Sequence, residues 1–390
     1  MKKLKSVLAL GLALSLSLAG CTKEDASDAG GQGDSSDVIK IGVFQPLTGA
    51  NAGGGEMETE GIKLANKMYP EVLGKKVELV IADNKSDKVE AGNAVAKLID
   101  SDKVSAIIGS WGSGYSMAAG EAVKNAQIPT VAPSATNPLV TQGNDFYFRA
   151  CFIDTFQGKV LAQLAYNELG ARKAAVIQEI NNDYSVGLAK FFMDEFKLLT
   201  GDENSIVEIS NYNTGDQDFS AQLTNVKGKK PDVIFAPGNF TESAMIISQA
   251  RNLGIESPFL GGDTWETPDF LSVGGPAVEG AMITTFFAVE KPMTELSGKF
   301  VEAYKAEYGT EPSAVAALGF DAYLMILQAI EKAGGVEDTV KIRDFLADTE
   351  NFEGATGRFS LDENGDAIKD VIIKTVKDGK FVYKTTIVHE

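Results

Sequence analysis

Short apolar segments alternate with amphipathic segments along most of the chain. The first four apolar runs are each flanked by polar or turn-forming residues, as buried strands are; they are 39–44, 77–82, 104–108 and 130–132. The segments between them repeat apolar side chains at helical spacing; they are 56–68, 89–99 and 117–126. Continuous apolar strands alternating with helices predict a parallel sheet covered on both faces.

The same alternation starts again after a break near residues 144–154. The second round predicts strands at 174–178, 206–209, 233–236 and 259–260. It predicts helices at 160–169, 184–199, 219–226 and 243–253. Two rounds of β-α-β alternation indicate the α/β class, with two doubly wound parallel-sheet lobes.

The last third of the chain has a different pattern. One strand at 282–287 precedes three helical segments, which are 293–308, 314–333 and 340–347. Residues 357–388 read as antiparallel strands with turns at 362–365 and 378–379. The chain is therefore expected to cross several times between lobe 1 (38–152 plus 287–355) and lobe 2 (153–286 plus 356–390). A cleft between such lobes lies at the carboxyl ends of the parallel strands.

The N-terminus is typical of an export signal. Three lysines precede the short apolar run 7–18, and the sequence Leu18-Ala19-Gly20-Cys21 resembles a bacterial lipobox. We expect residues 1–21 to be a lipoprotein signal peptide whose Cys21 is lipidated; the alternative is an ordinary secretory signal with an incidental cysteine. Residues 22–37, rich in Asp, Gly and Ser, are expected to be a flexible tether. No later segment is expected to cross a membrane.

Composition excludes several classes of function. The chain has 390 residues, 54 acidic and 36 basic, and a formal net charge of −18, which argues against nucleic-acid binding. Its single histidine is His389, so histidine-based catalysis or metal binding is not expected. Cys151 has no histidine near it in sequence and is expected to be a buried small hydrophobe. We therefore expect no enzyme activity, no metal and no cofactor.

Four loops after predicted strands hold small polar residues that suit ligand binding. In 109–115, backbone N–H groups near Ser113 suit a carboxylate, although a plain helix cap is equally compatible. The run 133–138 presents two hydroxyls between prolines, or is an ordinary rigid turn. Tyr184 stacks on a ligand or lies on a lobe surface, and Asp263 accepts a cation or caps the next helix.

Five segments together resemble one known family. They are Ile41–Gly49 (IGVFQPLTG), Pro133–Pro138 (PSATNP), Gly215–Ser220 (GDQDFS), Gly261–Asp263 (GGD) and Tyr308–Ser313 (YGTEPS). In this order and over nearly all of residues 38–390, they resemble the type I periplasmic binding proteins of the branched-chain amino-acid family. The resemblance implies a two-lobe clamshell that closes on a solute and delivers it to an ABC permease and its ATPase. It also implies a monomer in the cell envelope, held to the membrane through Cys21 and facing the extracytoplasmic side.

The resemblance also implies roles for individual residues. Ser113 and Thr136 would meet a ligand carboxylate, and Ala135, beside Thr136 in the 133–138 loop, would also be a ligand-binding residue. The carbonyl of Ser134, the hydroxyl of Thr136 and the carboxylate of Asp263 would meet an ammonium. Tyr184 would cover the ligand.

This chain departs from the family pattern around the ligand's side chain. Gly54 and Asn239 stand where aromatic residues are expected, Trp111 is an additional aromatic, and Asp263 is one methylene shorter than the family's glutamate. Trp111 and Asn239 are therefore expected to help shape a modified side-chain pocket. An amino acid is the expected ligand; the alternatives are an amide, a urea-like compound or an aromatic acid, or a role as a ligand-sensing receptor component.

Overall fold

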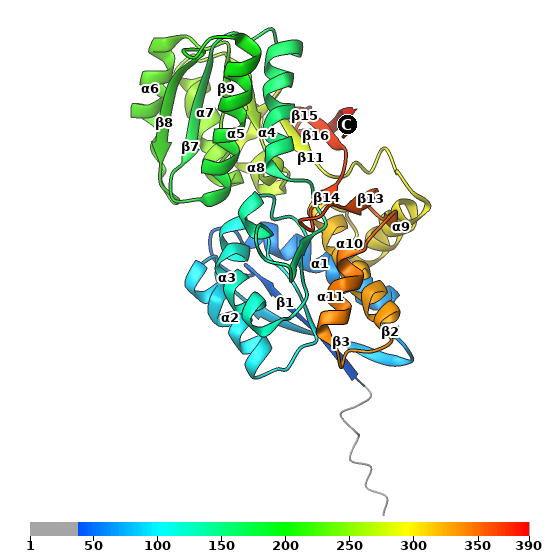
Figure 1. The fold of residues 1–390 in the computed structure, drawn as a ribbon. Coiled ribbons are helices and arrows are strands. Elements are labelled where there is room, and N and C mark those ends of the chain that lie inside the picture. The colour runs from blue at the N-terminus through cyan, green and yellow to red at the C-terminus, as the bar shows by residue number, and fades with distance from the viewer. Residues whose placement is uncertain (1–37, 390) are drawn as a thin grey trace, which may run out of the picture. The chain divides into compact units, whose positions relative to one another are not determined.

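The computed structural model describes residues 38–389. The expected signal peptide, Cys21 and the expected tether lie outside the described residues. The described chain forms one compact unit with two large, mainly parallel sheets and one small antiparallel sheet (Figure 1). The α/β class with doubly wound sheets is confirmed, while the residue bounds expected for the lobes stay predictions.

The first sheet has the strand order β2-β3-β1-β4-β5-β6. Its strands are β1 (Val38–Gln45), β2 (Glu71–Val72), β3 (Lys75–Asp83), β4 (Ala106–Ile108), β5 (Thr130–Ala132) and β6 (Tyr147–Arg149). The helices between them are α1 (Ala52–Met68), α2 (Lys88–Asp100) and α3 (Ser113–Ala126). Because β1 and β3 to β6 run parallel, their carboxyl ends share one edge of the sheet.

The second sheet has the strand order β16-β15-β11-β10-β9-β7-β8. Its parallel strands are β7 (Ala174–Glu179), β8 (Ile206–Tyr212), β9 (Val233–Phe235), β10 (Phe259–Gly261) and β11 (Met282–Thr285). The associated helices are α4 (Asp154–Gln163), α5 (Asp183–Thr200), α6 (Ser220–Lys229), α7 (Phe240–Asn252) and α8 (Pro268–Gly274). The C-terminal strands β15 (Val371–Lys377) and β16 (Lys380–Ile387) extend this sheet in antiparallel fashion, as the sequence predicts.

Three further helices and the small sheet lie between β11 and β15 in the chain. They are α9 (Glu295–Tyr308), α10 (Ala314–Ala333), α11 (Thr339–Ala347), β12 (Phe352–Gly354), β13 (Gly357–Leu361) and β14 (Ala367–Ile368). Helix α10 packs along α1 of the first sheet. The chain therefore leaves the first sheet after β6, returns to it after β11, and joins the second sheet again at β15.

Helix α10 corrects one expectation from the sequence. Its 20 residues are long and apolar enough to cross a membrane by length and composition, contrary to the expectation that no later segment meets this test. However, 89% of its most apolar window is buried within the protein, against α1 and the first sheet. We therefore interpret α10 as the core helix of the fold, which explains its continuous apolar sequence.

Other differences from the predicted elements concern short or polar segments. Helix α4 begins at Asp154 rather than at residue 160, and a π-helical turn at Leu164–Glu168 follows it. Its first turn was missed because it carries buried polar side chains in place of an apolar stripe. The turn at 378–379 has positive φ at both residues, 52° and 69°, as a tight hairpin between β15 and β16 requires.

A buried ion pair fixes the loop that follows β5. Arg149 is fully buried at the end of β6, and its Nε donates to Asp366 Oδ1 at 2.5 Å. The same guanidinium donates to the carbonyl oxygens of Ala135 and Asn137, at 2.6 and 3.0 Å. One cation therefore holds the backbone of the 133–138 loop from behind, while Asp366, in the turn between β13 and β14, supplies its counter-charge.

We expect Asp366→Ala to lower the free energy of unfolding by about 3–5 kcal/mol, because it leaves the buried Arg149 without its counter-charge. Asp194→Ala is the matched control, since it breaks the exposed pair of Asp194 with Lys190 and should cost less than about 0.5 kcal/mol. Urea denaturation of both variants measures the difference. Equal losses of stability would contradict the role given to Arg149.

Candidate functional site

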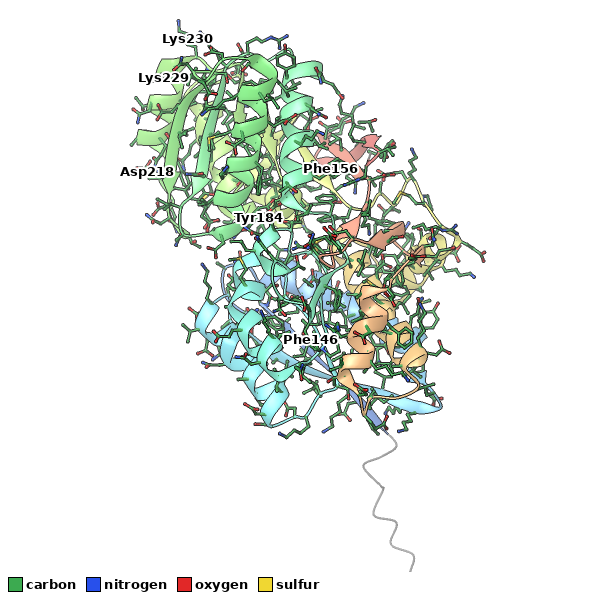
Figure 2. All side chains as sticks on the ribbon, viewed as in Figure 1. Phe146, Phe156, Tyr184, Asp218, Lys229 and Lys230 are labelled. Carbon is green, nitrogen blue, oxygen red and sulfur yellow. The ribbon has the colours of Figure 1, made fainter. Side chains whose placement is uncertain are left out.

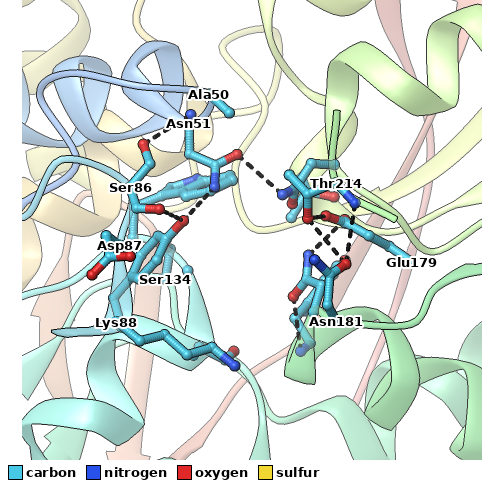
Figure 3. A pocket seen from close by; sticks show the side chains of 18 of the residues that line it. Ala50, Asn51, Ser86, Asp87, Lys88, Ser134, Glu179, Asn181 and Thr214 are labelled. Carbon is cyan, nitrogen blue, oxygen red and sulfur yellow. Dashed lines mark hydrogen bonds between the residues drawn. The ribbon is translucent and has the colours of Figure 1, made fainter. Parts of the chain in front are cut away.

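A cavity of about 370 Å³ lies where loops of the two large sheets meet (Figure 3). Its lining comes from the loops after β1, β3, β4 and β5 of the first sheet and after β7 to β10 of the second. The lining includes Ala50, Asn51, Ser86, Asp87, Lys88, Trp111, Ser113, Tyr115, Ser134, Glu179, Asn181, Tyr184, Thr214, Asn239, Asp263 and Thr264. The carboxyl ends of parallel strands thus form both walls, as expected for a ligand site in this fold class.

Six of the eight residues predicted to contact a ligand line this cavity. They are Trp111, Ser113, Ser134, Tyr184, Asn239 and Asp263. The other two, Ala135 and Thr136, are buried next to Ser134 and do not line the cavity. The Thr136 hydroxyl lies beside Asp154 without a hydrogen bond of acceptable geometry. Ligand contact by any of the eight stays a prediction.

The wall from the first sheet presents hydrogen-bond donors. Ser113 and Gly114 are the first two residues of α3, and within residues 38–389 their backbone N–H groups have no hydrogen-bond partner. The Ser113 hydroxyl does not cap this helix; it accepts a hydrogen bond from the N–H of Asn137 at 3.1 Å. A free helix N-terminus of this kind favours an anion such as a carboxylate.

The wall from the second sheet presents a carboxylate. Asp263 follows β10, and its Oδ1 accepts hydrogen bonds from the Tyr184 hydroxyl at 2.9 Å and from Gln157 Nε2 at 3.0 Å. It therefore does not act as a helix cap. Burial raises the pKa of Asp263 to about 6. Figure 2 shows Tyr184 at the level where the loops of the two sheets meet, which agrees with its place in the cavity wall.

Trp111 forms the large apolar part of the wall, and Gly54 makes room for it. The Trp111 ring packs against Phe240 of α7, edge to face, with 6.3 Å between ring centroids. A Cβ on Gly54 would lie only 2.4 Å from Trp111 Cε2. The absence of an aromatic side chain at position 54 is therefore coupled to the presence of one at 111. By contrast, Trp265 is fully buried against Phe270 and does not line the cavity.

Direct contacts join the two walls at the cavity. Asn239 Nδ2 donates to Asn51 Oδ1 at 3.0 Å, and both side chains are buried. Lys88 of α2 pairs with Asp183 of α5, with 2.5 Å between Nζ and Oδ2. Asn239 therefore contacts the opposite wall. The sequence analysis had assigned it only to the side-chain pocket, because it replaces an expected aromatic residue.

The sequence analysis did not single out Asn51, Tyr115, Glu179 or Thr214, although each lines the cavity. Glu179 is almost fully buried and accepts hydrogen bonds from Thr214 and Asn182. Burial raises its pKa above the usual range of a glutamate. Only their positions could have indicated these two residues, because Glu179 ends β7 and Thr214 follows β8. Among residues 38–389, no group of three His, Cys, Asp or Glu side chains gathers as a metal site.

A buried acid supports the first wall from behind. Glu58 of α1 is fully buried, and its carboxyl group bonds with the Ser134 hydroxyl and, at 2.5 Å, with Gln45 Nε2. Gln45 in turn accepts a hydrogen bond from the N–H of Trp111 at 2.8 Å. Burial raises the pKa of Glu58 to about 8, so the group is mainly neutral at pH 7. Glu58 and Gln45 thereby connect the Trp111 loop to the Ser134 loop.

The chain resembles known proteins over most of its length. The Leu/Ile/Val-binding protein homolog 1 of Brucella suis is 30% identical over 356 residues, which cover 89% of this chain and 93% of that protein. The solved leucine-binding protein of Thermotoga maritima is 44% identical, with a TM-score of 0.86 over 90% of this chain and 99% of that one.

A second solved structure is the branched-chain amino-acid substrate-binding protein of Streptococcus pneumoniae in complex with isoleucine. It is 33% identical, with a TM-score of 0.83, and covers 90% of this chain and 99% of its own. The family model described as periplasmic binding protein matches residues 38–380. Sequence and fold agree, and the chain belongs to the periplasmic binding protein family, whose members are extracytoplasmic substrate-binding proteins of transport systems.

Proposed function

We propose that this protein captures an α-amino acid with a branched aliphatic side chain and delivers it to an ABC import permease. The proposal includes anchoring to the membrane through a lipidated Cys21, which the Leu18–Cys21 motif supports. The observation that carries the ligand assignment is the opposite polarity of the two cavity walls. One wall ends in free helix N–H groups and the other in the carboxylate of Asp263.

The wall with the free N–H groups suits a ligand carboxylate. The N–H groups of Ser113 and Gly114 add to the partial positive charge at the start of α3. Lys88, the cation in the cavity lining, is already paired with Asp183. A carboxylate is therefore neutralised by backbone dipoles, which hold their orientation before the ligand arrives.

The wall with Asp263 suits a ligand ammonium. Asp263 accepts two hydrogen bonds from neutral donors, and within residues 38–389 it forms no ion pair. An amide, a urea-like solute or an aromatic acid would bring no cation to this buried carboxylate. A zwitterion brings one, and charge-assisted hydrogen bonds are roughly twice as strong as neutral ones.

The ligands of two solved relatives and the apolar surface of Trp111 both favour a branched aliphatic side chain on the ligand. The two solved relatives described above are a leucine-binding protein and an isoleucine complex. In this chain the indole of Trp111 is the large apolar surface of the cavity wall. Contact with it removes apolar ligand surface from water, at about 25 cal/mol per Å².

Isothermal titration calorimetry on unfolded and refolded, ligand-stripped protein tests the ammonium contact. We expect leucine, isoleucine or valine to bind, and Asp263→Asn to weaken that binding by about 2–4 kcal/mol, roughly 30- to 1,000-fold. Asp100→Asn, on the exposed face of α2, is the control and should bind like the wild type. Binding of benzoate or a neutral amide in preference to every amino acid would contradict the proposed function.

The coupling between Gly54 and Trp111 generates a second test. Gly54→Ala places a methyl group inside the indole, so we expect at least about a tenfold loss of affinity for leucine and about 1–3 kcal/mol lower stability. Gly92→Ala in α2 is the matched control, because its nearest atom would be 3.8 Å away, and it should leave binding unchanged. Unaltered leucine affinity in Gly54→Ala would show that Trp111 does not shape the ligand site.

A further inference from the structure

A second buried carboxylate lies behind Asp263. Asp154, the first residue of α4, is fully buried, and its Oδ1 accepts a hydrogen bond from Gln157 Nε2 at 2.9 Å. The same nitrogen donates to Asp263 Oδ1 at 3.0 Å. One amide group therefore bridges the two acids, which lie within two hydrogen-bond lengths of each other.

The orientation of this bridging amide is fixed by its other end. Gln157 Oε1 accepts a hydrogen bond from the Thr284 hydroxyl at 2.6 Å and a longer one, 3.3 Å, from the N–H of Asp263. Both of those partners approach as donors, so this end must be the carbonyl oxygen. The two hydrogens of Nε2 are thereby directed at the two carboxylates.

No cation within residues 38–389 forms an ion pair with either acid, although the charge of Arg149 acts to lower the pKa of Asp154. Neither Asp154 nor Asp263 forms an ion pair, and Arg149, the nearest cation on β6, is bonded to Asp366 and to two backbone carbonyls. Lys369 donates to Thr356 and to the carbonyl of Ala150. The charged and titratable groups that face the pair from the surrounding elements are Arg149, Cys151, Tyr184, Glu266 and Lys369.

Two buried acids this close, without a cation between them, are not both ionised at neutral pH. Burial, and then the charge of Asp263, raise the pKa of Asp154 to about 8, against about 6 for Asp263. Of the two acids, Asp154 is therefore the one that favours its protonated form. Its Oδ2 is buried without a hydrogen bond of acceptable geometry, and the Thr136 hydroxyl lies near the same carboxyl group. This oxygen is where the proton fits the geometry.

We infer that Asp154 and Asp263 hold one proton between them in the ligand-free cleft, and that the ammonium of the ligand displaces it into solvent. The inference rests on the proposed amino-acid ligand. Asp154 is a positioning residue here, since Gln157 and Asp263 stand between it and the cavity. The ammonium brings one positive charge as one proton leaves, so the acid pair together with the ammonium keeps a net charge of −1. The ligand carboxylate is met separately, by the N–H groups at the start of α3.

The sign of the pH dependence follows from this exchange. A bound ammonium favours the ionised form of both acids and lowers their pKa values. Between the pKa of the complex and that of the free protein, binding releases protons, so affinity rises with pH. We expect affinity for leucine to increase from pH 6 to pH 8 and then to level off.

Calorimetry with leucine at pH 7, in buffers of low and high ionisation enthalpy, measures the released protons directly. We expect a release of up to about one proton per leucine in the wild type. In Asp154→Asn, which mimics the protonated acid, the release should fall to near zero, with affinity at pH 6 within about threefold of the wild type. Asp194→Asn, an exposed acid of α5, is the control and should release as many protons as the wild type.

The same titration with 2-hydroxy-4-methylpentanoate, which replaces the ammonium of leucine by a hydroxyl, should release no proton. Should the D154N variant fail to fold, the two-buffer titration of the wild type with leucine still tests the proton exchange. Leucine binding with equal heats in both buffers would overturn the proton exchange while leaving the proposed function intact. Absence of binding by every amino acid would overturn both.

Discussion

An amino acid carries two opposite charges, and a cleft that closes over it removes both from water. Each buried charge costs several kcal/mol unless a partner of opposite sign meets it. In the proposed complex the two partners belong to different sheets: the first turn of α3 supplies N–H groups, and Asp263 after β10 supplies a carboxylate. Because neither wall neutralises both ends of the ligand, closure is favourable only with a ligand that carries both charges. A ligand with differential contacts in the closed state is what shifts a hinge equilibrium.

The rest of the site holds these two groups in place. Arg149 fixes the loop after β5 through its carbonyls, and Glu58 with Gln45 links that loop to Trp111. On the other wall, Gln157 orients Asp263 and connects it to Asp154. These supports are buried and polar, so every donor or acceptor left without a partner would be costly. The contact between Asn51 and Asn239 adds a direct link between the walls that needs no ligand.

The alternating strand and helix pattern was sufficient to predict both sheets and the loops that carry the site, because carboxyl ends of parallel strands meet at one edge. Five predicted residues line the cavity for this reason, while the sixth, Asn239, came from the family resemblance. The sequence could not indicate that Thr136 lies behind the wall, or that Asn239 bonds with Asn51, since these facts depend on how distant segments pack. Gln157 was missed for a related cause: a polar residue near the start of a helix usually faces solvent, whereas this one is fully buried. Likewise, the apolar sequence of α10 is explained as that of a core helix only once its burial within the protein is known.

A crystal structure of the protein with leucine tests the central claim, that one wall binds the carboxylate of an amino acid and the other binds its ammonium. The account predicts the leucine carboxylate at the start of α3, about 3 Å from the N–H groups of Ser113 and Gly114. It places the ammonium in contact with Asp263 and the side chain against Trp111. A leucine bound in the reverse orientation, or with its ammonium away from Asp263, would contradict it.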